Sequence, residues 1–129
     1  MINFTSYFNQ FESVQSEKLN ELVTLGKELH EDVLGQMLEL FRESTTEIIE
    51  KLHLNFQLKN TKEIAAFAHQ LKSSAGNIGL TKLHQMCTYL EKGIKESSLN
   101  TDEISNLVVM VEKEFLFAMS ELKQFEKAA

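Results

Sequence analysis

The sequence predicts an all-α protein: an antiparallel up-down-up-down four-helix bundle with one or two short additional helices at the N-terminus. Three observations favour this class. The 129 residues contain no proline, the residue that most strongly interrupts long helices. Apolar residues recur at helical spacing along most of the chain, and no alternating apolar and polar run predicts a strand. Short connections around residues 58–60, 79–81 and 97–101 favour antiparallel packing of consecutive helices.

Residues 4–11 place four aromatic side chains on one face of a short amphipathic helix. These are Phe4, Tyr7, Phe8 and Phe11. We expect this face to pack on the rest of the chain, the alternative being a docking or dimerisation surface. A second short helix is predicted after Ser16, with Gly26 near its end. We therefore divide the chain into an N-terminal aromatic extension at 1–16 and a bundle domain at 17–129.

The first long helix of the bundle is predicted from about Leu29 to Leu58. Its apolar stripe consists of Val33, Met37, Leu40, Phe41, Ser44, Ile48, Leu52 and Phe56. The second long helix is predicted to begin at Asn60, because Glu63 three residues later completes a capping box. It is predicted to end just before Gly79, a residue suited to a helix C-terminus.

The third and fourth long helices occupy the rest of the chain. The third has a stripe formed by Leu83, Cys87, Leu90 and Ile94. Asn100 and Glu103 repeat the capping box before the fourth helix. Its stripe is the longest in the sequence: Ile104, Leu107, Val108, Val111, Phe115, Ala118, Met119, Leu122 and Phe125. The register of Cys87 predicts a small core residue rather than a reactive thiol.

The charge distribution indicates which classes of partner the protein can bind. A net charge of −6 argues against nucleic acid, which attracts proteins mainly through lysine and arginine. Residues 59–92 nevertheless carry five lysines against two glutamates, so this basic segment suits an anionic substrate or an acidic partner surface. The alternative is a solvated lysine face. A single cysteine, no leader-like segment and no apolar run of membrane-spanning length predict a cytoplasmic protein without a membrane partner.

The histidines predict no metal site. None of His30, His53, His69 and His84 pairs with another at a spacing of three or four residues. Glu50 and His53 have the Glu-x-x-His spacing of di-iron bundles, but such sites need a second copy and two further carboxylates. We expect Glu50 and His53 at the surface or its boundary.

His69 is the strongest candidate for chemistry. The core-facing residues of its helix lie on the opposite side: Ile64, Phe67, Leu71, Ala75 and Ile78. Small residues share the side of His69: Ala65, Ser73 and Gly76. A neutral imidazole can attack phosphorus, and Lys72, one turn along, can steady the resulting anion. An exposed histidine, open to approach and next to a lysine, predicts a phosphoryl acceptor.

Residues 68–80 read AHQLKSSAGNIGL, which resembles the signature of histidine-containing phosphotransfer (HPt) domains of multistep phosphorelays. The resemblance continues through Leu83, Cys87, Leu90 and Glu91 and reaches upstream to residues 38–41, covering roughly 18–125. It implies a helical bundle that carries phosphoryl groups, without a cofactor of its own and without independent enzymatic turnover. It implies receiver domains of hybrid histidine kinases and response regulators as partners, with Mg²⁺ bound by the receiver, and a monomeric carrier.

The resemblance also implies roles for individual residues. His69 would be the phosphoacceptor, and Lys72 would stabilise the phosphate. Glu91 falls where many members have a glutamine that orients the histidine ring, so we expect it to hold the ring while adding negative charge. The partner-binding surface would use Ala65, Ala66, Ser73, Gly76 and Gly79, with the glycines keeping the face open and shaping the turn. Ser73 departs from the glycine that usually follows the lysine.

Two alternatives compete with this reading. Residues 28–36 resemble the phosphoacceptor box of some sensor histidine kinases, which would make His30 the active residue of a dimerisation fragment. Against this, His30 lies near the apolar stripe of its helix and the chain has no ATP-binding domain, so we expect a boundary residue at a helix start. The other alternative is a helical adaptor without phosphoryl chemistry.

Overall fold

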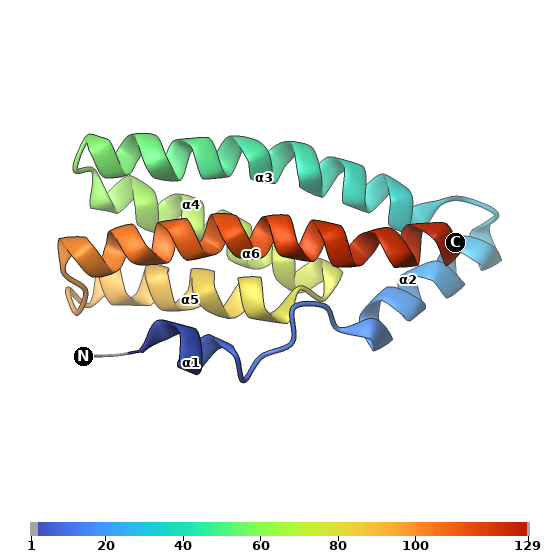
Figure 1. The fold of residues 1–129 in the computed structure, drawn as a ribbon. Helices are drawn as coiled ribbons and strands as arrows, with labels where there is room; N and C mark the ends of the chain where they lie inside the picture. The colour runs from blue at the N-terminus through green and yellow to red at the C-terminus, as the bar shows by residue number, and fades with distance from the viewer. Residues whose placement is uncertain (1–2, 129) are drawn as a thin grey trace.

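The computed structural model describes residues 3–128, which form six helices (Figure 1). They are α1 (Phe4–Phe8), α2 (Ser16–Leu29), α3 (Val33–Gln57), α4 (Thr61–Ile78), α5 (Thr81–Lys95) and α6 (Thr101–Ala128). Residues 3–128 contain no strand, so the all-α class is confirmed. Over the same range, no helix is both long and apolar enough to cross a membrane.

Helices α3 to α6 form the four-helix bundle. Each packs on the next along the chain, and α6 returns to pack against α3, which closes the ring (Figure 1). The bundle interior holds side chains that are fully or almost fully buried. They include Leu38, Leu52, Ile64, Leu71, Leu83, Leu90, Leu107 and Leu122. Burying each such side chain contributes about 1.5–3 kcal/mol, so this core is the main source of stability.

Asparagine caps fix the starts of two bundle helices. At α6, Asn100 Oδ1 accepts from the Glu103 backbone N–H at 2.8 Å, and Glu103 Oε1 accepts from the Asn100 N–H at 2.9 Å. At α4, Asn60 Oδ1 lies 3.4 Å from the Glu63 backbone nitrogen. Each cap supplies an acceptor to a backbone N–H that has none inside its helix. Both predicted helix starts are confirmed.

The start of the first long helix was predicted wrongly. Leu29 ends α2, and His30 follows it in the left-handed conformation with a φ of 55°. The chain then reverses, and Asp32 Oδ1 accepts from the Gly35 N–H at 2.9 Å, so that α3 begins at Val33. An aspartate cap sets the start of α3, four residues after the start at about Leu29 that apolar spacing predicted.

The buried face of α3 also differs from the predicted stripe. Leu40 is 68% exposed, and Ser44 is exposed as well, so placing them in the core was wrong. The buried positions are Leu34, Leu38, Phe41, Thr45, Ile48, Ile49, Leu52 and Asn55. Since α3 packs against α2, α4 and α6, the directions of these neighbours select which of two adjacent apolar stripes is covered.

The N-terminal arm, residues 3–15, lies against α5. Phe4 and Phe8 are 8% and 1% exposed, and their rings lie 5.5 Å and 5.8 Å from the ring of Tyr89 on α5. The prediction that this aromatic face packs on the chain itself is confirmed. The division of the chain at residue 16 stays a prediction.

The same arm binds the α4–α5 turn. The Gln15 N–H donates to the Gly79 carbonyl at 2.8 Å, and the Lys82 N–H donates to the Glu12 carbonyl at 2.7 Å. The first N–H groups of a helix lack partners within it, so Glu12 satisfies one of those of α5. The arm therefore completes the hydrogen bonding of the turn that joins the two helices.

Gly79 at this turn is expected to tolerate no side chain without cost. It ends α4 with a φ of 87°, and an added Cβ would lie 2.8 Å from Lys18 Cβ. Gly79→Ala is expected to lower the free energy of unfolding by about 1–2 kcal/mol, because the left-handed conformation is unfavourable for alanine. Chemical denaturation measures this change. Asn77→Ala, in the exposed last turn of α4, is the control, and equal stability of Gly79→Ala and the parent would contradict the argument.

Candidate functional site

His69 lies at the middle of α4 with its ring toward solvent. Its side chain is 58% exposed. The opposite face of α4 packs into the bundle through Ile64, Ala68, Leu71 and Ala75, all fully buried. The predicted outward orientation of His69 is therefore confirmed, and a rigid, well-packed helix carries the ring.

Glu91 on α5 fixes the ring of His69. Its Oε2 atom lies 2.8 Å from His69 Nδ1. An ionised carboxylate can only accept hydrogen bonds, so Nδ1 carries the hydrogen and donates it. The other ring nitrogen, Nε2, then keeps its lone pair in the neutral imidazole. The geometry selects one tautomer and leaves Nε2 as the nucleophilic atom.

Two lysines bind the same carboxylate. Lys72 Nζ donates to Glu91 Oε1 at 2.7 Å, and Lys95 Nζ donates to Glu91 Oε2 at 2.7 Å. Glu91 is only 5% exposed. Burial on its own raises the pKa of this carboxyl, but the hydrogen bonds from Lys72, Lys95 and His69 outweigh it and lower the pKa to about 2. Glu91 is thus ionised near neutral pH, and one carboxylate faces two ammonium groups.

Sequence reasoning missed Lys95. It is four residues after Glu91 on α5, a spacing at which a glutamate and a later lysine meet on one helix face, and this was the available signal. Lys72 was expected to be free to bind an anion beside His69. The structure instead pairs it with Glu91 and leaves its side chain 25% exposed.

The small residues around His69 are not all open. Ala66 and Ser73 are exposed, as predicted. Ala65 is only 4% exposed, so the expectation that it lies on an open face was wrong, because α5 packs closely against that side of α4. The Ser73 hydroxyl lies 3.4 Å from the His69 carbonyl oxygen and bonds back to its own helix.

The two glycines have structural reasons of their own. Gly76 is exposed, but an added Cβ would lie 3.1 Å from His84 Nδ1, because the His84 ring donates to the Lys72 carbonyl at 2.9 Å. The absence of a side chain at Gly76 therefore leaves room for the His84 ring and leaves this face of α4 open to a partner. Gly79 is buried against Lys18 of α2 and Gln15 of the N-terminal arm, so its expected place in the partner surface was wrong, while its role in the turn is confirmed.

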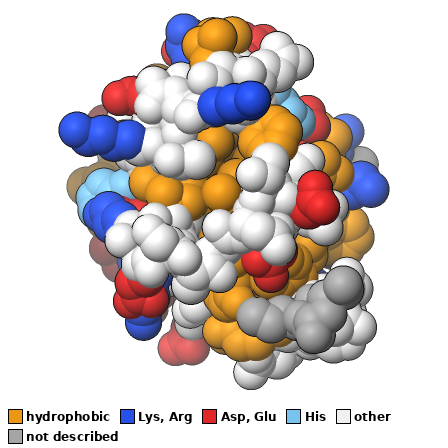
Figure 2. Space-filling model, turned by 90° about the vertical axis from the view of Figure 1, so that its left-hand side faces the viewer, with side chains coloured by type: hydrophobic (Ala, Val, Ile, Leu, Met, Phe, Trp, Pro, Cys, Tyr) orange, Lys and Arg blue, Asp and Glu red, His pale blue; other side chains and the backbone are white. Residues whose placement is uncertain are grey.

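A hollow of about 750 Å³ opens beside His69 between α4 and α5. It is lined by Thr61, Lys62, Ala65, Ala66, His69, Gln70, Glu91, Ile94 and Lys95. Apolar side chains and lysines are thus combined in one exposed depression. Figure 2 views the end of the molecule with the α3–α4 and α5–α6 connections, and shows lysine and histidine side chains beside exposed hydrophobic ones.

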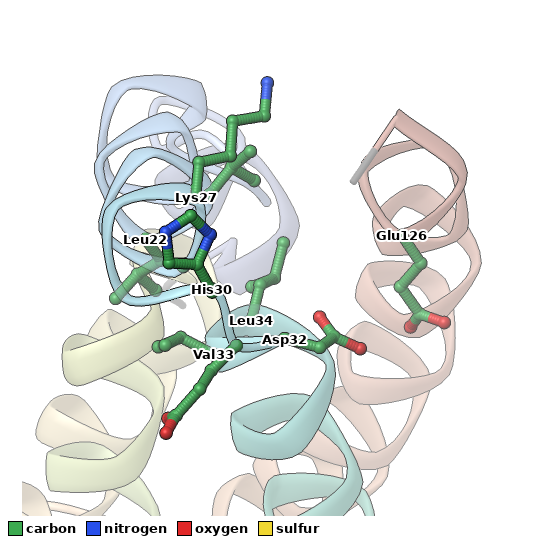
Figure 3. A pocket seen from close by; sticks show the side chains of 10 residues that line it. Leu22, Lys27, His30, Asp32, Val33, Leu34 and Glu126 are labelled. Carbon is green, nitrogen blue, oxygen red and sulfur yellow. The ribbon is translucent and has the colours of Figure 1, made fainter.

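The other candidate residues lie apart from this site. His30 is exposed at the end of α2 in a separate hollow of about 510 Å³. Figure 3 shows it beside Lys27, with the carboxylates of Asp32 and Glu126 on the opposite side. It is a boundary residue, as predicted, although at the end of a helix rather than at its start. In the described range, no group of three or more histidine, cysteine, aspartate or glutamate side chains could hold a metal ion.

Two further predictions concern single side chains. His53 is at the surface boundary, where its Nε2 lies 3.0 Å from Glu112 Oε1 across α3 and α6, and Glu50 is exposed, as predicted. Cys87 is fully buried in the core, as predicted. Burial raises the pKa of its thiol, which is therefore protonated and inert.

Comparison with known proteins agrees with the geometry. The model of the Hpt domain family matches residues 36–124. The sensor protein TorS of Escherichia coli (strain K12) is 26% identical over 104 residues, which are 81% of this chain and only 11% of TorS. The X-ray structure of a rice protein described as a histidine-containing phosphotransfer protein aligns with this chain with a TM-score of 0.75. The alignment covers 97% of this chain and 90% of the rice chain. The two sequences are 21% identical, so this match speaks for the fold alone.

Proposed function

The chain belongs to the Hpt domain family, and on that basis we propose that His69 accepts a phosphoryl group from the phosphoaspartate of one receiver domain and passes it to, or takes it back from, another. Histidine phosphotransfer in phosphorelays is the work of this family. The observation that carries the assignment to His69 is its hydrogen bond of 2.8 Å to Glu91, which holds Nδ1 and leaves Nε2 at an exposed surface.

The proposed transfer is a displacement at phosphorus. The Nε2 lone pair of His69 forms the new N–P bond while the P–O bond to the receiver aspartate breaks, and the aspartate leaves as a carboxylate. Because Nδ1 keeps its proton, the phosphorylated ring is an imidazolium cation. Glu91, already 2.8 Å from Nδ1, stabilises that cation without moving.

The hollow between α4 and α5 is the proposed docking surface for the receiver. Ala66 and Ile94 offer apolar contact, and Lys62 offers positive charge close to the exposed ring. Positive charge suits the acidic surroundings of a phosphoaspartate and speeds association at low salt. We propose that the Mg²⁺ for transfer belongs to the receiver, and that the chain is a monomeric cytoplasmic carrier without turnover of its own.

The test is transfer from a purified phosphorylated receiver in the presence of Mg²⁺. We expect phosphate on the chain that is labile in acid and stable in alkali, and peptide mapping by mass spectrometry that assigns it to His69. Phosphate on His30 together with a dimeric size in solution would support the kinase fragment instead. No transfer from any receiver of the same organism would support the adaptor.

Lys72→Ala is expected to slow transfer or shorten the lifetime of phosphohistidine by about tenfold, because one of two ammonium groups near the phosphoryl group is lost. Single-turnover transfer and the decay of isolated phosphoprotein measure the two quantities. Lys51→Ala removes an exposed lysine from α3 and serves as the control. Unchanged values for both quantities in Lys72→Ala would remove this lysine from the mechanism.

A further inference from the structure

We propose that Lys95 is a positioning residue for phosphoryl transfer to His69: it neutralises Glu91, so that the carboxylate holds the ring without repelling the incoming phosphoryl group. This inference rests on the proposed function. It assigns Lys95 a task distinct from that of Lys72, although both lysines contact the same carboxylate at 2.7 Å in the resting protein.

The need for neutralisation follows from the position of Glu91. Its Oε2 is 2.8 Å from Nδ1, and the phosphoryl group would bind the other nitrogen of the same small ring. The two anions would then be closer than the Debye length of about 8 Å at physiological salt, so solvent ions screen their repulsion poorly. Burial of Glu91 to 5% exposure weakens screening by water as well. A glutamate that orients this ring therefore needs a permanent counter-charge.

Lys95 is placed to remain with Glu91 during transfer. It donates to Oε2, the same oxygen that accepts from His69 Nδ1, whereas Lys72 donates to Oε1. It also follows Glu91 at i+4 on α5, the favourable order for a helical ion pair. Lys72 comes from α4, the helix of His69 itself, and can turn from Oε1 toward a phosphoryl group one helical turn away.

This arrangement has a signature that a simple loss of positive charge lacks. Without Lys95, Lys72 must neutralise Glu91 and the phosphoryl group at once. With glutamine in place of Glu91, the amide oxygen still accepts from Nδ1–H but carries no charge, and Lys95 has nothing to neutralise. The effect of removing Lys95 is therefore expected to depend on the charge of residue 91.

The experiment compares transfer rates from one phosphorylated receiver to five proteins: the parent, Lys95→Ala, Lys95→Arg, Glu91→Gln and the double variant Glu91→Gln/Lys95→Ala. Lys95→Ala is expected to be about tenfold slower than the parent, and Lys95→Arg close to it. The double variant is expected to lie within about threefold of Glu91→Gln, a strongly non-additive result. Lys92→Ala, which removes an exposed lysine from the same helix, is the matched control.

The outcomes separate this inference from its alternatives. Lys95→Ala as fast as the parent would overturn it. The inference is also overturned if Lys95→Ala slows transfer by the same factor in the Glu91→Gln background as in the parent. Lys95 would then be a docking residue of the hollow. Absence of transfer in the parent would instead refute the proposed function. Thermal unfolding by circular dichroism checks that the variants are folded, which the 63% exposure of Lys95 favours.

Discussion

Replacing His69 with glutamine is expected to abolish phosphoryl acceptance, with a fall in transfer rate of at least about a thousandfold. Glutamine keeps a polar side chain on the exposed face of α4, but its amide nitrogen has no nucleophilic lone pair. The side chain is 58% exposed and its ring forms a hydrogen bond with Glu91, so the bundle is expected to stay folded when this bond is changed. Radiolabelled transfer from a phosphorylated receiver measures the change.

His30→Gln is the matched control for this substitution. His30 is exposed, lies at the end of α2 outside the hollow beside His69, and loses the same functional group in the variant. It is expected to accept phosphate at the parental rate. Retention of label by His69→Gln together with loss by His30→Gln would reverse the assignment and favour the sensor-kinase fragment.

Lowering the pH from about 5 to about 2 is expected to reduce the free energy of unfolding of the parent by about 3 kcal/mol more than that of Glu91→Gln. The pKa of Glu91 is about 2 in the folded protein against an ordinary value of 4.5, so the folded state binds fewer protons than the unfolded state between these values. Its contribution is therefore complete above the unfolded pKa and is lost as the pH falls through the folded one.

Denaturant unfolding of both proteins across this pH range measures the effect as a difference between two curves. Glu114 acts in the opposite direction, because burial raises its pKa, but it is present in both proteins and cancels in the difference. Parallel curves for the parent and Glu91→Gln would show that the ion pairs of Glu91 contribute no net stability. The result bears directly on the site, because the same contacts hold His69.

The sequence predicts the helices well where local signals act alone. Asn60 and Asn100 cap helices with their own side chains, so their positions are readable without knowledge of the partners. Leu40 shows the limit of prediction from local signals, because its exposure of 68% depends on how the neighbouring helices are placed around α3. Spacing identifies an apolar stripe, but it does not identify which of two overlapping stripes is covered.

The same distinction applies to the site. The outward direction of His69 follows from the spacing within α4 and was predictable. The burial of Ala65 and Gly79 depends on α5 and on the N-terminal arm, which no pattern within α4 reveals. The i+4 spacing signals that Glu91 and Lys95 can pair on α5, but their convergence with Lys72 and His69 requires the packing of two helices, so it could only be seen in the structure.

The arm that binds the α4–α5 turn also bears on which parts of the molecule open together. Gln15 and Lys82 tie the arm to the turn by backbone hydrogen bonds, and Phe8 anchors its other end with 1% exposure. We expect amide hydrogen exchange at the turn to be slowed by the aromatic anchor, because Phe8 holds the arm on α5 when the two hydrogen bonds break locally. Because this turn joins the helices that carry His69 and Glu91, we expect the opening of both helices to be linked to detachment of the N-terminal arm.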